Sequence, residues 1–178
     1  MKKYISLLAL ALVFGVMTSC DSDPSDSSTS AGGTKVKKMA GSWIVTAYMC
    51  DDQGDVANID AWDWYELGSF EGPMNTYNTS ANKSTEMWVD DNGELYLGAG
   101  TDYSCKAKVN VNYGKRTFSV EDADNEYSDE KITIVGGKIL AKAATNEDGV
   151  KVDSIVYYVK AGNAPYGYIK VSGHRNKF

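Results

Sequence analysis

The segment Ser104-Cys105-Lys106-Ala107-Lys108-Val109-Asn110-Val111-Asn112-Tyr113-Gly114 alternates polar and apolar side chains without a break. A period of two is typical of a β-strand with one wet and one dry face. Gly114 then turns the chain into a second extended run, residues 116–120, in which Phe118 and Val120 supply the buried side. The segment therefore predicts two successive strands and an all-β protein.

The same period continues on both sides of this segment. Trp43, Val45, Ala47 and Met49 share one face of a first strand that begins near Met39. Further extended runs, separated by polar or glycine-containing turns, cover residues 74–79, 85–90, 94–97, 132–135, 138–143, 152–159 and 167–175. The chain thus predicts about nine or ten short strands, with one helical turn near residues 60–67.

Two dipeptides predict the tightest turns. Asn92-Gly93 is the strongest hairpin signal, because both central positions of a type I′ turn require positive φ. It is expected to join the strand before it to residues 94–97. Gly136-Gly137 is expected to join the strands on either side of it in the same way.

The order of these elements favours one architecture. No long helix separates the strands, so parallel crossovers are excluded and neighbouring strands pair antiparallel. An antiparallel sheet of this size has unpaired edges unless it closes on itself. We therefore expect an up-and-down β-barrel rather than a two-sheet sandwich.

The amino terminus predicts export. Lys2 and Lys3 precede an apolar run that ends before Cys20, as in a secretory signal, and this run is too short and wrongly flanked for a membrane-spanning helix. The arrangement resembles a bacterial lipoprotein signal, which implies cleavage after residue 19 and a lipid on Cys20. We expect a signal peptide at 1–19, the lipidated cysteine and a flexible tether at 20–38, and a single barrel domain at 39–178.

Charge and targeting restrict the partners. The chain has a net charge of −6, and loss of Lys2 and Lys3 with the signal would make it −8, which argues against nucleic acid and against attachment through a basic face. The expected contact with the membrane is the lipid on Cys20. The acidic residues that follow it resemble the surface-export signal of Bacteroidetes-type lipoproteins, which implies an outer-membrane protein exposed at the cell surface. The sequence leaves open whether the domain faces the surface or the periplasm. Nothing in the sequence predicts an oligomeric state.

Cys50 and Cys105 remain for the folded domain. In an oxidising compartment they can form a disulfide. They can equally be two separately buried thiols that behave as small hydrophobic residues. The sequence leaves both alternatives open.

Enzyme chemistry finds little support. His174 is the single histidine, no Gly-x-Ser-x-Gly elbow is present, and Ser172 lies two residues from His174, too far along a strand for a direct hydrogen bond. One histidine and two separate cysteines exclude the usual zinc sites, and the acidic residues between 121 and 130 lack the spacing of a calcium loop. We expect neither catalytic residues, nor a metal, nor a cofactor.

Aromatic side chains are the remaining candidates. Trp62, Trp64, Tyr65 and Phe70 crowd into one connection after the first strand, where they either plug a barrel or line its entrance. Further candidates for a ligand-binding wall are Met87, Trp88, Tyr96, Phe118 and Tyr157. Because side chains alternate across a strand, about half of these point outwards.

Two resemblances refine the barrel. Gly41-Ser42-Trp43 resembles the Gly-x-Trp signature of lipocalins, whose tryptophan closes the narrow end of the barrel. Lipocalins place an arginine late in the last strand against that ring, and Arg175 stands where this partner is expected. The resemblance implies a lipocalin-like, calycin-type barrel closed by Trp43 and Arg175, a cation–π contact worth about 0.5 to 2 kcal/mol.

The second resemblance covers most of the chain, from about Met39 to Phe178. It rests on the segments Tyr77-Asn78-Thr79-Ser80-Ala81-Asn82, Ser84-Thr85-Glu86-Met87-Trp88-Val89-Asp90-Asp91, Asp153-Ser154-Ile155-Val156-Tyr157-Tyr158 and Tyr168-Ile169-Lys170-Val171-Ser172-Gly173-His174-Arg175. These are similar to a family of secreted Bacteroidetes proteins described as lipid-binding putative hydrolases. The resemblance implies a lipocalin-like fold and a lipid ligand, and it supplies no catalytic residues.

Three hypotheses of function follow. The first is a lipoprotein that holds a lipid or other small apolar ligand in a barrel cup. The second is a surface lipoprotein that binds glycan or protein through its outer face, with Trp62, Trp64, Tyr65 and Tyr157-Tyr158 turned outwards. The third is a weak lipid esterase, which lacks a suitable base in this sequence.

Overall fold

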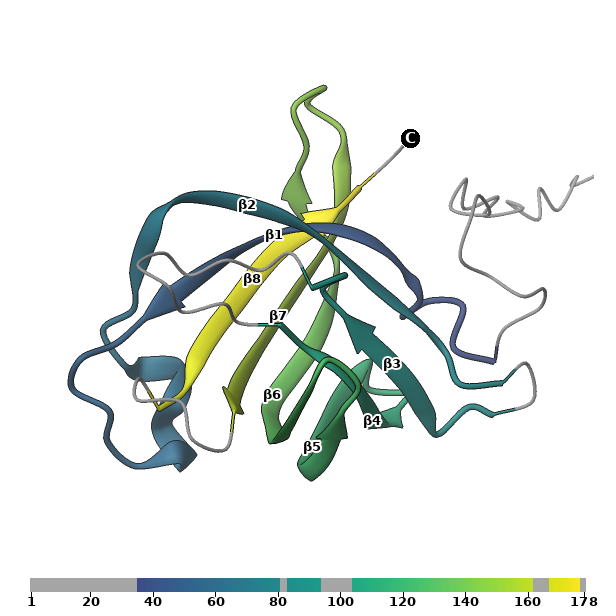
Figure 1. Ribbon diagram of the computed structural model, residues 1–178. Coiled ribbons are helices and arrows are strands. Elements are labelled where there is room, and N and C mark those ends of the chain that lie inside the picture. Colours follow the sequence, from purple (N-terminus) through teal and green to yellow (C-terminus); the bar gives the residue numbers. More distant parts are fainter. Residues whose placement is uncertain (1–34, 81–82, 94–103, 162–166, 177–178) are drawn as a thin grey trace, which may run out of the picture.

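The structure is a computed structural model that describes residues 35–80, 83–93, 104–161 and 167–176, without the side chains of residues 67–71 and 161. These residues form eight strands and one 3₁₀ helix (Figure 1). The elements are β1 (Gly41–Met49), η1 (Val56–Ala61), β2 (Tyr65–Asn78), β3 (Glu86–Asp90), β4 (Lys106–Asn112), β5 (Thr117–Asn125), β6 (Ser128–Thr145), β7 (Lys151–Ala161) and β8 (Ile169–Arg175).

The strands form a closed antiparallel barrel in chain order. Each strand pairs with the next one, and β1 also pairs with β8, where Trp43 stands opposite Arg175. The predicted up-and-down barrel is therefore confirmed and the sandwich is excluded. Closure removes the two edges that an open sheet would expose.

Alternation along the strands places the core inside the barrel. On β1 the side chains of Trp43, Val45 and Ala47 are buried, while the residues between them are partly exposed. On β4 the buried residues are Ala107 and Val109, as the period of two predicts. The inward faces of the strands merge into one hydrophobic core.

Gly136-Gly137 is not a hairpin turn, as the sequence suggested, but a bulge inside the long strand β6. Gly136 has a φ of +61° and is the extra residue of this bulge. The spacing of the buried side chains explains the bulge. Ile134 and Ile139 both face inwards although they are five positions apart, and in a regular strand residues an odd number apart face opposite sides. One additional residue is required to keep both side chains on the inner face.

The other turns are partly as predicted. Asn92 and Gly93 have φ values of 59° and 70°, which confirms the positive φ at both positions. The predicted partner strand at residues 94–97 lies outside the described residues. The next described strand, β4, pairs with β3.

The helical turn differs from expectation, and the acidic segment after Val120, which the sequence indicates to be a loop, is part of a strand. The helix covers Val56–Ala61 instead of residues 60–67, because the Asp55 side chain accepts a hydrogen bond from the Ala57 amide and so caps it there. The acidic residues after Val120 do not form a loop. They continue β5 to Asn125, and a two-residue turn leads into β6.

Candidate functional site

The centre of the barrel is apolar around one tyrosine. Tyr157 of β7 is fully buried, its hydroxyl lies 3.2 Å from the Met74 sulfur, and its ring centroid lies 5.8 Å from that of Phe118. Met87 of β3 also points inwards and is fully buried. Of the predicted wall residues, Met87, Phe118 and Tyr157 therefore belong to the interior.

A buried carboxyl group lies beside this apolar centre. Asp91 accepts hydrogen bonds from the amides of Gly93 (2.9 Å) and Cys105 (2.7 Å), and burial raises its pKa to about 7. The pKa of Tyr157 is raised well above its ordinary value, first by burial and further by Cys105 and Asp91. Sequence reasoning missed Asp91, although it follows Met87 and Val89 at the same alternating positions and so shares their inner face.

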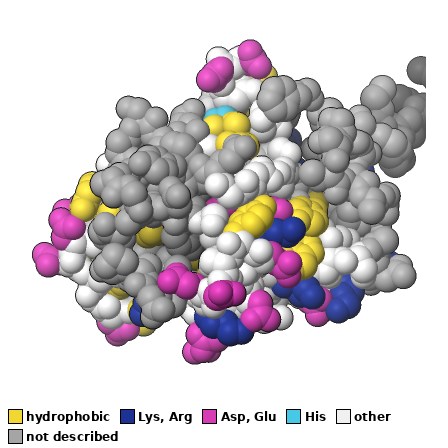
Figure 2. Space-filling model, viewed as in Figure 1, with side chains coloured by type: hydrophobic (Ala, Val, Ile, Leu, Met, Phe, Trp, Pro, Cys, Tyr) yellow, Lys and Arg dark blue, Asp and Glu magenta, His cyan; other side chains and the backbone are white. Residues whose placement is uncertain are grey.

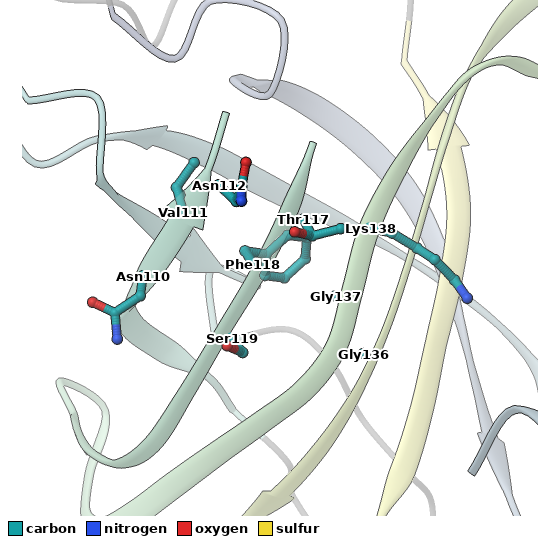
Figure 3. A pocket seen from close by; sticks show the side chains of 9 residues that line it. All are labelled: Asn110, Val111, Asn112, Thr117, Phe118, Ser119, Gly136, Gly137 and Lys138. Atoms are coloured by element: carbon teal, nitrogen blue, oxygen red, sulfur yellow. The ribbon is translucent and has the colours of Figure 1, made fainter. Parts of the chain in front are cut away.

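A pocket of about 480 Å³ opens in the wall of the barrel (Figure 3). Its lining comes from three neighbouring strands: residues 110–112 of β4, 117–119 of β5 and 136–138 of β6. Lys138 is the charged residue of this lining; Figure 3 shows its side chain directed away from the others, and its ammonium group lies 3.0 Å from Asp60. The remaining polar lining residues carry amides and hydroxyls, so the pocket suits a neutral polar group.

The aromatic connection lies against the outside of the barrel wall. The rings of Trp62 and Trp64 stack with centroids 5.5 Å apart, and Trp64 lies 5.3 Å from Tyr158. Tyr158 alternates with the inward Tyr157 and therefore points outwards, yet it is buried, and its hydroxyl donates a hydrogen bond to Asp60 in η1. The two tryptophans thus cover part of the outer face of the barrel. This position is neither the plug nor the entrance lining that the sequence suggested for them.

The other aromatic candidates are distributed differently. Tyr65 begins β2, is exposed, and donates a hydrogen bond to Asp51 (2.7 Å). Phe70 lies in β2 with a side chain that is not described, and Tyr96 lies outside the described residues.

Trp88 points out from β3 and lies within 5.7 Å of the ammonium groups of Lys106 and Lys108. On the face shown in Figure 2, hydrophobic, basic and acidic side chains lie next to one another over β3 and β4. Trp88 therefore belongs to the outer surface and not to the lining of the interior.

Trp43 and Arg175 meet at the junction of the first and last strands. The guanidinium carbon lies 4.7 Å from the indole centroid, and both side chains are buried. Arg175 also donates a hydrogen bond to the Ala40 carbonyl (2.8 Å). A Cβ at Gly41 would collide with the guanidinium, which gives the Gly-x-Trp pattern a steric reason.

Among the residues that the structure describes, no catalytic group is assembled around the single histidine. Ser172 and His174 lie on β8 with no hydrogen bond between them, and the His174 ring contacts the Arg175 carbonyl instead. Among the described residues, no three His, Cys, Asp or Glu side chains could hold a metal ion. Cys50 and Cys105 are both buried and free, so the structure has two separate thiols and not the disulfide.

The closed antiparallel barrel with an apolar interior places the chain in the class of up-and-down β-barrels, an architecture that can enclose a small ligand. Residues 28–177 match the family described as "lipid-binding putative hydrolase", and the chain belongs to that family. The match confirms the lipid-binding family that the sequence resembles, while its Bacteroidetes origin and secretion stay predictions. A lipid-binding role fits both the family and the barrel. No curated protein matches the chain. In the described part of the chain, no helix has the length and hydrophobicity needed to span a membrane.

Proposed function

We propose that the protein binds a lipid or another small apolar molecule and buries its apolar part inside the barrel. The observation that carries this proposal is the continuous apolar interior, which the wall pocket reaches at Phe118. Membership of a lipid-binding family supports a lipid as the ligand.

The energetic basis is burial of hydrocarbon. Each Å² of apolar ligand surface removed from water contributes about 25 cal/mol. An eight-stranded barrel holds side chains or one small ligand, so the ligand must displace side chains that can move. Met74 and Met87 in the interior are unbranched and can adopt other rotamers, which makes them suited to this exchange.

Native mass spectrometry of the exported protein, purified from its own cells, tests the proposal. A stable adduct with the mass of a lipid is the expected result. A clean apo mass that also takes up nothing from a lipid extract would remove the barrel-interior hypothesis.

The proposal includes a location. The predicted signal at 1–19, Cys20 and the polar segment from residue 21 to residue 34 support an outer-membrane lipoprotein of Bacteroidetes type, exposed at the cell surface and tethered by its lipid. Metabolic labelling with a fatty acid should mark the wild type and leave Cys20→Ala unlabelled. Digestion of intact cells with protease should remove the domain, and full protection would contradict surface exposure.

A second candidate function is an outer-face binder of glycan or protein. The position of Trp62 and Trp64 on the outside of the barrel favours it, because partly exposed aromatic rings stack on sugars and anchor protein partners. Quenching of tryptophan fluorescence by oligosaccharides, lost in Trp62→Ala, would support this function over lipid binding.

A further inference from the structure

We propose that the wall pocket is the way into the barrel for a neutral single-chain amphiphile. The polar head stays among the amides and hydroxyls of the pocket, and the hydrocarbon chain passes the Phe118 ring into the interior. This inference rests on the proposed function and adds the place of access and the chemistry of the head group.

Phe118 is shared by the pocket and the interior. It lines the pocket, is 3 % exposed, and belongs to the core, where its ring faces that of Tyr157. Beside it, Gly137 offers no side chain: a Cβ there would lie 2.5 Å from Phe118 ring and carbonyl atoms. The phenyl ring thus occupies the space that the glycine leaves, as Figure 3 shows between β5 and β6. Rotation of this one ring would connect the pocket to the interior.

The wall is irregular at this point. β4 and β5 are paired at three positions, residues 110–112 with 117–119. The register between β5 and β6 shifts directly after Phe118, opposite the bulge at Gly136. A bulge interrupts the ladder of backbone hydrogen bonds, so fewer of them hold the strands together here than in a regular sheet.

The pocket lining selects the head group. Asn110, Thr117 and Ser119 make no side-chain hydrogen bond to another described residue, so their donors and acceptors can serve a ligand. Lys138 is engaged by Asp60, so the lining offers no uncompensated charge. These groups suit a hydroxyl-bearing head such as glycerol better than a phosphate or a carboxylate. A volume of about 480 Å³ lies within the usual range of small-molecule sites.

The test fills the pocket from outside. Ser119→Trp adds a large ring to the pocket at an exposed position of β5, away from the core. Glu121→Trp is the matched control, since Glu121 is exposed on the same strand but does not line the pocket. Equilibrium dialysis with radiolabelled monooleoylglycerol should show about tenfold weaker binding for Ser119→Trp and binding within about twofold of wild type for Glu121→Trp.

Two further measurements sharpen the result. Phe118→Leu keeps an apolar side chain but removes the ring, and should speed uptake of monooleoylglycerol in stopped-flow experiments by about fivefold. The wild type should bind monooleoylglycerol more tightly than oleate or a lysophosphatidic acid of the same chain.

If Ser119→Trp, correctly folded by circular dichroism, binds as the wild type does, the access route is wrong although lipid binding stands. If the wild type binds none of the three lipids and nothing from a lipid extract, the proposed function itself fails.

Discussion

Replacement of Arg175 by methionine tests how the barrel is closed. The guanidinium lies over the Trp43 indole, donates hydrogen bonds to the carbonyls of Ala40 (2.8 Å) and Lys38 (3.4 Å), and lies 3.5 Å from the Asp153 carboxylate. Methionine fills much of the volume of arginine, so the substitution removes the charge and the hydrogen bonds and leaves only a small cavity. The two hydrogen bonds join the last strand to the segment before β1, so the substitution acts on the closure itself.

The magnitude follows from these interactions. A desolvated cation–π contact contributes about 2 kcal/mol. Loss of one partner of a buried, hydrogen-bonded charge pair costs about 3 to 5 kcal/mol, and the Asp153 side chain, 18 % exposed, keeps part of its hydration. We therefore expect Arg175→Met to lower the free energy of unfolding by about 4 kcal/mol.

Arg116→Met is the matched control. Arg116 also pairs with Asp153, at 3.7 Å, but its side chain is 26 % exposed, so its loss should cost at most about 1 kcal/mol. Urea titration followed by tryptophan fluorescence measures both variants. A loss under 1 kcal/mol for Arg175→Met, or equal losses for the two variants, would refute the assigned closing role.

Burial raises the pKa of Asp91 from 3.8 to about 7, so between these pH values the native protein keeps a proton on Asp91 that the unfolded chain has lost. The free energy of unfolding should therefore fall as the pH rises from about 4 to 7. Urea titrations across this range should show that slope in the wild type and lose it in Asp91→Asn. Gly173→Ala would bring a Cβ into the Ile44 carbonyl of the neighbouring strand, and should lower the free energy of unfolding by about 3 kcal/mol or more in the same titration. Trp64→Ala removes the ring from Tyr158 and should cost about 2 kcal/mol, with faster proteolysis near η1; an unchanged digestion pattern would contradict its anchoring role.

Much of the fold could be predicted from local patterns. The faces of β1 and β4 follow directly from alternation, and the Asn92-Gly93 turn from the φ that its type requires. The bulge could also have been found, because the odd spacing of Ile134 and Ile139 does not fit an uninterrupted strand. A pair of glycines predicts both a hairpin turn and a bulge, and the apolar spacing around it decides between them.

The candidate site was predictable only in part. Alternation predicted that Phe118 is buried, whereas Tyr157 was one of several wall candidates whose direction the sequence left open. The sequence offered no sign that Trp64 covers Tyr158 on the outer face, because that contact joins residues distant in the chain. The wall pocket likewise combines three strands, and its lining includes one ring packed against one glycine.

The sequence by itself determined that the chain is all-β and which face of each regular strand is dry. Those properties are encoded in the period of two and in single turns, which act over a few residues. The tertiary structure decided the register shifts, the outer cover of Tyr158 by η1 and Trp64, and the meeting of pocket and interior at Phe118. These depend on how distant segments align and pack, and no local pattern specifies that alignment.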